Sequence, residues 1–152
     1  MDEKNAIRLF EDKKIRTAWD EEQEEWYFSV QDVVAVLAES SDPKQYIKKM
    51  RARDPELSAN WGTICTPVQM SAADGKMRKI QAADTEGLLR IIQSIPSPKA
   101  EPFKRWLAKV GRERIEETID PEQAIDRALE TYQKKGYDTD WIHQRLLSIR
   151  VR

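Results

Sequence analysis

Short apolar and aromatic runs alternate with charged turns over the first half of the chain. Three of them, 6–10, 14–19 and 25–28, predict antiparallel strands because they are rich in Ile, Leu, Phe, Trp and Tyr. Two further runs, 64–70 and 77–82, flank an Ala-Asp-Gly turn, which is typical of a β-hairpin. The sequence therefore predicts a small antiparallel sheet.

Apolar residues at helical spacing predict six helices. Ser29, Asp42, Asp84 and Asp120 are expected to cap four of them, and a proline follows Asp42 and Asp120 at the first helical position. Asp54-Pro55 is expected to end the second helix and to leave Trp61 in a loop. The predicted helices run from 30 to about 39, from 43 to 53, from 84 to 95, from near 102, from 121 to Gly136, and from about 140 to 152.

These elements indicate an α+β fold. Small antiparallel strands and hairpins are packed with several short helices, and a C-terminal helical pair follows. We expect one domain over residues 1–118 and a helical hairpin over 119–152. A length of 152 residues fits such an arrangement and excludes a large multidomain enzyme.

Composition excludes several classes of protein. No apolar run approaches the roughly 20 residues that span a bilayer, and the charged start at 1–4 is unlike a signal peptide, so no membrane partner is expected. One cysteine and one histidine exclude an internal disulfide and a zinc site built from cysteine and histidine. A reducing cytoplasm is the expected location.

No convergent catalytic set is visible. The five glycines are scattered singly, so they form neither a dinucleotide fingerprint nor a phosphate loop. His143 is expected at the surface, and Cys65 is expected to be a small buried hydrophobe because no histidine lies near it in the sequence. We expect no enzyme, no cofactor and no metal; a metal-dependent nuclease is the least favoured alternative.

Charge is segregated although the formal net charge is only -1. Residues 44–53 contain five basic residues and no acid, and residues 99–114 contain six basic residues against two acids. Acids gather at 20–25 and over 113–130. Solvated faces are the simplest interpretation of such runs, and a phosphate-binding surface is the alternative.

The helix after Asp42 offers the clearest basis for nucleic-acid binding. Lys44, Lys48 and Arg51 recur at i, i+4 and i+7 and share one stripe, so their like charges repel by a few tenths of a kcal/mol per pair. Phosphates or acidic neighbours would relieve this repulsion. Trp61 could stack on a base, although burial over the core is the favoured role.

The helix from 102 carries a second basic stripe. Its apolar positions Phe103, Trp106, Leu107 and Val110 are expected to face the core, and its cations the opposite side. A third basic group lies at the predicted tip of the hairpin. The complete set of candidate nucleic-acid-binding residues is Lys44, Lys48, Lys49, Arg51, Arg53, Lys76, Arg78, Lys79, Lys104, Arg105, Lys109 and Arg112.

Three segments carry a family resemblance over about residues 5–117. They read IRLFEDKKIRTAWDEEQEEWYFSVQDVVAVLAES, DPKQYIKKMR and TEGLLRIIQSIPSPKAEPFKRWLAKVGRERIEE. In this order they resemble the BRO-N domain of phage and prophage antirepressors and baculovirus repeated-ORF proteins, in the subgroup similar to the bacterial DNA-damage-inducible protein D. One departure is that Ala38 and Glu39 follow Leu37, where many members have a Leu-Gly pair.

The resemblance implies an α+β DNA-binding or antirepressor module without known catalytic residues. It favours binding of double-stranded DNA, with roles in transcription regulation and the DNA-damage response. The alternative is protein–protein interaction, either with a repressor or between two copies through the C-terminal helices. Residues 120–152 resemble the start of a C-terminal region in that subgroup, which suggests the N-terminal part of a longer protein.

Overall fold

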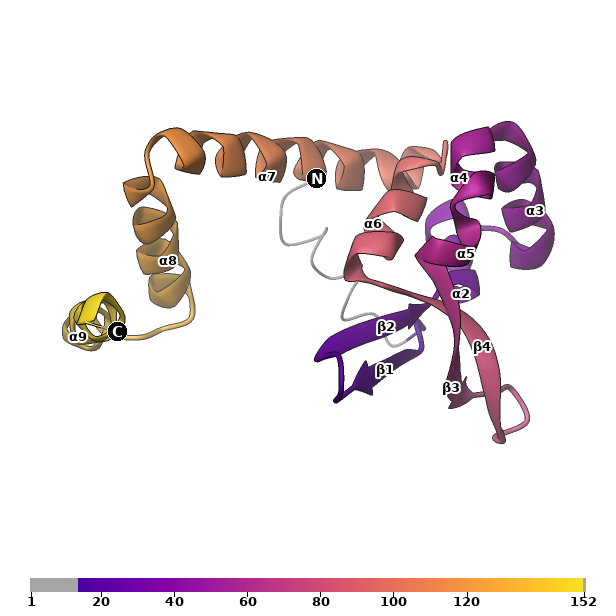
Figure 1. The fold of residues 1–152 in the computed structure, drawn as a ribbon, viewed down its shortest axis with the longest axis horizontal. Helices are drawn as coiled ribbons and strands as arrows, with labels where there is room; N and C mark the ends of the chain where they lie inside the picture. Colours follow the sequence, from indigo (N-terminus) through magenta and orange to yellow (C-terminus); the bar gives the residue numbers. More distant parts are fainter. Residues whose placement is uncertain (1–13, 152) are drawn as a thin grey trace. The chain divides into compact units, whose positions relative to one another are not determined.

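The computed structural model describes residues 14–151, with side chains up to Ser148 (Figure 1). The described chain forms two compact units, which meet between Leu107 and Ala108 and are called unit 1 and unit 2. The predicted boundary between 118 and 119 falls near the end of the helix that crosses this junction. The predicted strand over 6–10 lies outside the described residues.

Unit 1 contains a four-stranded antiparallel sheet with the order β1-β2-β4-β3. The strands are β1 (Thr17–Asp20), β2 (Glu25–Ser29), β3 (Cys65–Ser71) and β4 (Met77–Asp84). The α+β prediction and both hairpins are thereby confirmed. The strand predicted from residue 14 begins only at Thr17, because Arg16 is held by the helix that follows β2.

The β1–β2 and β3–β4 hairpins are hydrogen-bonded to each other over a short segment only. β2 pairs with β4 from Tyr27 opposite Asp84 to Ser29 opposite Ala82, whereas β3 pairs with β4 along its whole length. Beyond the short shared segment the hairpins diverge (Figure 1). The turn of the β3–β4 hairpin uses Gly75 at a φ of +82°, a conformation that costs glycine little.

Arg16 joins the sheet to α2 (Val30–Ala38), the first helix among the described residues. Its guanidinium donates from Nε to Asp32 Oδ2 at 2.7 Å and from Nη2 to Asp32 Oδ1 at 2.8 Å, and its backbone N–H also reaches Oδ2 at 2.9 Å. Arg16 Nη1 donates to the carbonyl of Ser71 at the end of β3, at 3.1 Å. Ser29, fully buried, caps α2 through Asp32 N as predicted. One arginine therefore links β1, α2 and β3.

The remaining helices of unit 1 enclose an apolar core. They are α3 (Pro43–Arg53), α4 (Pro55–Ala59), α5 (Trp61–Ile64), α6 (Thr85–Gln93), the 3₁₀ turn η1 (Pro98–Ala100) and the start of α7 (Glu101–Ile119). Asp42 and Asp84 cap α3 and α6 as predicted, by accepting from Gln45 N and Gly87 N. The core joins Val34, Met50, Leu57 and Ile92.

The prediction of a loop around Trp61 is wrong for residues 55–64. They form α4 and α5, and Trp61 is only 5% exposed. The cause is Asp54, whose side chain accepts from Leu57 N at 3.1 Å, so the Asp-Pro pair that ends α3 also starts α4. The helical path buries Leu57 beside Trp61 in the core.

The end of α2 uses a residue other than glycine in a left-handed conformation. Glu39 takes the left-handed conformation at a φ of 53°, which glycine adopts without strain. Lys99 of η1 lies 3.5 Å from the Glu39 carboxylate.

Unit 2 consists of the rest of α7, α8 (Glu122–Lys134) and α9 (Thr139–Val151). Gly136 follows α8 at a φ of +89°, as the predicted stop requires. Asp120 does not cap α8 as predicted, because the helix begins at Glu122 without a side-chain cap. Val110 is exposed instead of facing a core, because Leu107 is the last residue of α7 that packs on the core of unit 1.

Arg127 of α8 holds unit 2 together. Its guanidinium pairs with the carboxylates of Glu113, Glu116 and Glu117 on α7. Tyr132, Tyr137 and Trp141 form a ring cluster in which the last two stack at 4.3 Å. No described helix is long and apolar enough to cross a membrane.

A substitution at Gly87 tests how closely α6 packs on the rest of unit 1. A Cβ at this position would lie 2.8 Å from the backbone oxygen of Ile64 and 3.3 Å from the Ala83 Cβ. We expect Gly87→Ala to lower the free energy of unfolding by about 1–3 kcal/mol because backbone must move. Urea denaturation followed by circular dichroism measures this.

Gly62→Ala is the matched control. Gly62 is also helical, and a Cβ at this position would meet no atom within 4 Å. This variant should be as stable as the parent or slightly more stable, by up to about 1 kcal/mol. Equal destabilisation by both variants would contradict the close packing at Gly87.

Candidate nucleic-acid interface

The strongest candidate surface is the outer side of α3. Asp42 and Pro43 start the helix, and Ile47 and Met50 anchor it in the core. At about 100° per residue, the positions away from these anchors carry the cations. We call them the α3 basic face: Lys44, Lys48, Lys49, Arg51 and Arg53. It contains no acid, as the sequence predicted.

The lysines of the α3 basic face are exposed and unpaired. Within the part of the chain that the structure describes, the side chains of Lys44, Lys48, Lys49 and Arg53 make no ion pair or hydrogen bond. Their charges therefore repel one another without local compensation, which favours an anionic partner.

Arg51 differs from its neighbours because it is held in place. Its guanidinium carbon lies 5.0 Å from the centroid of the Trp61 ring, a cation–π contact that orders the side chain. Arg51 Nε and Trp61 Nε1 are both buried without a hydrogen-bond partner among the described residues. Trp61 is thus a buried support for Arg51, and stacking on a base is excluded by its burial.

Asp54 anchors the end of α3. Its backbone N–H donates to the Met50 carbonyl, and its Oδ2 accepts from Ser94 Oγ at 2.8 Å and from Arg90 Nη2 at 3.4 Å. The hydrogen bond from Leu57 N, followed by those from Ser94 and Arg90, holds the pKa of Asp54 below its ordinary value. Sequence reasoning missed this role: the Asp-Pro pair signals the turn, but nothing in the sequence points to Ser94.

Two cations of the predicted stripe on α7 pair with acids of their own helix. Lys109 Nζ lies 3.9 Å from Glu113, and Arg112 Nε lies 3.7 Å from Glu116. Both residues belong to unit 2. Lys104 and Arg105 lie in unit 1 and have no ion pair within the described chain. The cations on α7 are thus unequal candidates for binding phosphate, because the charges of Lys109 and Arg112 are partly neutralised by Glu113 and Glu116.

The tip of the β3–β4 hairpin is separate from the α3 basic face. Lys76, Arg78 and Lys79 are exposed there, and Arg78 pairs with Asp74 at 2.5 Å, which lowers the pKa of that carboxyl. The tip and α3 lie at opposite ends of unit 1 (Figure 1). The structure therefore does not bring the twelve candidate residues into one cluster.

Comparison with known proteins identifies the family. The profile of the BRO family, N-terminal domain, matches residues 14–113, which includes the sheet and the α3 basic face. The chain belongs to this family. No curated protein and no solved structure matches it.

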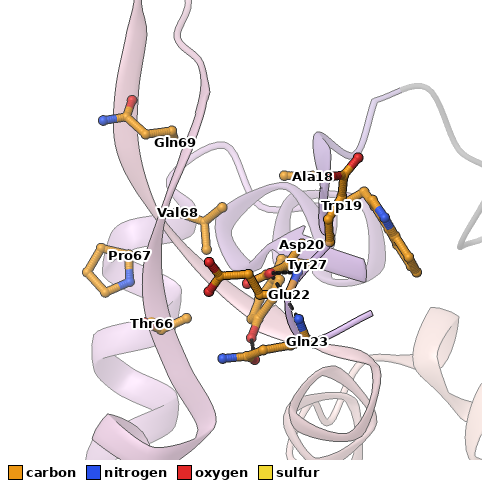
Figure 2. A pocket seen from close by; sticks show the side chains of 11 residues that line it. Ala18, Trp19, Asp20, Glu22, Gln23, Tyr27, Thr66, Pro67, Val68 and Gln69 are labelled. Carbon is orange, nitrogen blue, oxygen red and sulfur yellow. Dashed lines mark hydrogen bonds between the residues drawn. The ribbon is translucent and has the colours of Figure 1, made fainter. Parts of the chain in front are cut away.

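The β1–β2 hairpin of this BRO N-terminal domain forms a second candidate surface, of opposite charge. A hollow of about 470 Å³ lies between this hairpin and β3 (Figure 2). Asp20, Glu21 and Glu22 are among the residues that line it. The Tyr27 hydroxyl donates to Gln23 Oε1 at 2.8 Å. Desolvation and then Asp20 raise the pKa of Tyr27. The acids disfavour phosphate binding at this hairpin.

Two tryptophans on the same hairpin are exposed. Trp19 and Trp26 are cross-strand neighbours with ring centroids 5.2 Å apart, and they are 47% and 50% exposed. The sequence indicated strands at 14–19 and 25–28, but nothing in it distinguished these rings from core residues, so this surface was missed.

The single cysteine, Cys65, lies in unit 1 of this BRO N-terminal domain, and the single histidine, His143, lies in unit 2. Burial raises the pKa of the Cys65 thiol to about 12, so it is protonated at neutral pH, as expected of a buried hydrophobe. His143 is exposed on α9. Among the described residues no group of three or more His, Cys, Asp and Glu side chains could hold a metal ion.

The Asp54 anchor gives a test with a defined pH dependence. The pKa of Asp54 is lower in the folded chain than its ordinary value of 3.8, so its contribution to stability is complete above that value and is lost as the pH falls through the folded pKa. We expect Asp54→Asn to be less stable than the parent at pH 7, with the difference shrinking in acid. Thermal denaturation at several pH values measures this.

Asp42→Asn is the control for the Asp54 variant. Asp42 caps α3 before a proline, as Asp54 caps α4, and in the described chain its carboxylate accepts only from the backbone of Gln45. Asparagine keeps such a cap, so this variant should lose less stability. A loss at Asp54 that is independent of pH would contradict the role of its charge.

Proposed function

We propose that this chain binds duplex DNA by placing the α3 basic face on the phosphate backbone. One observation carries the proposal: α3 carries four exposed cations and the half-buried Arg51, without an acid, while its inner side is fixed in the core. Four of them have no side-chain ion pair or hydrogen bond within the described residues. BRO N-terminal domains are generally associated with DNA binding in phage and viral proteins, which supports the same function.

Binding of this kind is driven by the release of counterions from DNA. Each lysine that neutralises a phosphate frees part of the condensed cation atmosphere, so affinity falls as salt rises. Arg51, already ordered over Trp61, would lose less conformational freedom on binding than a free side chain. Contacts of this type position a protein on DNA and do not select a sequence.

The wider role that we propose is regulatory and not enzymatic. We infer a prophage antirepressor-like regulator in transcription and the DNA-damage response, in line with the resemblance to DNA-damage-inducible protein D. The unpaired cations and the protonated Cys65 suit binding better than catalysis.

Charge-matched double variants test the interface. Lys44→Ala/Lys48→Ala removes two unpaired cations from α3, and Lys109→Ala/Arg112→Ala removes two cations that face acids of their own helix. We expect the α3 variant to weaken binding to a random duplex more strongly. Its slope of log affinity against log salt should fall by about 0.9 per lost contact. Fluorescence anisotropy at several salt concentrations measures both quantities.

The α7 variant separates a local contact from a loss of overall charge. Both double variants change the net charge by the same amount, so equal effects would indicate that the α3 basic face has no special role. Binding that neither variant alters would place DNA on another surface, and absence of binding even at low salt would refute the proposal.

A second candidate function is capture of a basic protein, such as a repressor. The observation that favours it is the exposed pair Trp19 and Trp26 beside the acidic turn of the β1–β2 hairpin, because aromatic rings and carboxylates together suit arginine and lysine side chains. It uses a different surface from DNA binding, so both functions can be tested separately.

An arginine-rich peptide is the probe for this second function. Tryptophan emission should change during titration of the parent, and Trp19→Ala/Trp26→Ala should abolish peptide binding measured by calorimetry. The Lys44→Ala/Lys48→Ala variant should bind the peptide at least as well as the parent. Unchanged peptide binding by the tryptophan variant would exclude this hairpin as the binding surface.

A further inference from the structure

Unit 2 buries little of its apolar surface. Among its described side chains only Ile142 is fully buried, and α8 contributes no buried residue although one of its sides is apolar. So small a unit rarely reaches stability through its own core. The contacts within unit 2 therefore leave this apolar side uncovered.

The uncovered apolar side has a definite place between α8 and α9. Ile125 of α8 and Leu147 of α9 are 38% and 59% exposed, and with His143 and Leu146 they line a hollow of about 300 Å³. Exposed apolar residues around a hollow are typical of an interaction surface.

Charge indicates which partner fits this surface. Residues 113–130 contain seven acids and two bases, whereas residues 131–152 contain five bases and two acids. Among the described side chains no ion pair joins α8 to α9. Glu122 and Asp126 on the acidic side, and Lys135 and Arg145 on the basic side, have no ion pair within the described chain. Unit 2 therefore carries unpaired charges of both signs, which the opposite charges of a second copy can pair.

We propose that unit 2 is a homodimerisation surface. In a two-fold dimer the same patch of each copy meets its counterpart, so the apolar residues around Ile125 and Leu147 cover one another. Glu122 and Asp126 of one copy then face Lys135 and Arg145 of the other. The inference does not rest on DNA binding; if both hold, a dimer carries two α3 basic faces and gains avidity on one duplex.

Sedimentation velocity of the complete chain over a range of concentrations tests the proposal without DNA. We expect a dimer, and we expect Leu147→Glu to raise its dissociation constant by at least about tenfold. Met77→Glu is the matched control, because Met77 is 63% exposed on β4 of unit 1 and should leave the dimer intact. Circular dichroism of each variant checks that the helices remain folded.

Charge-reversal variants distinguish a lost interface from a folding defect, because a misfolded variant would not regain self-association when mixed with its partner variant. Glu122→Lys/Asp126→Lys and Lys135→Glu/Arg145→Glu should each weaken self-association, and an equimolar mixture of the two should restore a dimer. A monomer at every concentration would overturn the proposal, because the surface would then be covered within one chain. A dimer that Leu147→Glu leaves unchanged, or a mixture that is not restored, would overturn it as well.

Discussion

The carboxylate of Asp32 is the point on which the architecture of unit 1 depends. It lies in the first turn of α2, where it interacts favourably with the helix dipole, and it accepts three hydrogen bonds from Arg16. The same arginine reaches the carbonyl of Ser71, and the buried Ser29 hydroxyl accepts a further bond from it at 3.4 Å. β2 and β4 pair over a short segment only. The hydrogen bonds of Arg16 therefore add connections between the two hairpins that the strand pairing does not provide.

The hydrogen bonds of Asp54 fix the position of the basic helix α3. α3 packs against α2 on one side and continues into α4 on the other, and Asp54 joins that corner to the end of α6. The cations of α3 can therefore remain unpaired without loss of the helix, since its position is set by core contacts and by Asp54. Repulsion among lysines is small beside the burial of Ile47 and Met50.

The sequence predicted what depends on neighbours along the chain. Ser29, Asp42 and Asp84 identified helix starts, and the spacing of Lys44, Lys48 and Arg51 identified a shared face, because caps and helical stripes are local. Asp32 with Arg16, and Asp54 with Ser94, depend on folding that brings distant segments together. The pairing of Lys109 with Glu113 was readable from its spacing of four, but the separation of the hairpin tip from α3 was not.

The burial of Cys65 has a practical consequence for spectroscopy. It is the single cysteine of the chain, and its protonated, buried thiol reacts slowly with maleimides and other thiol-directed labels. A cysteine introduced at an exposed position would then be the one site that takes a fluorophore or spin label at neutral pH. Distances between such labels could be measured on the native background, without first replacing a residue that packs in the core.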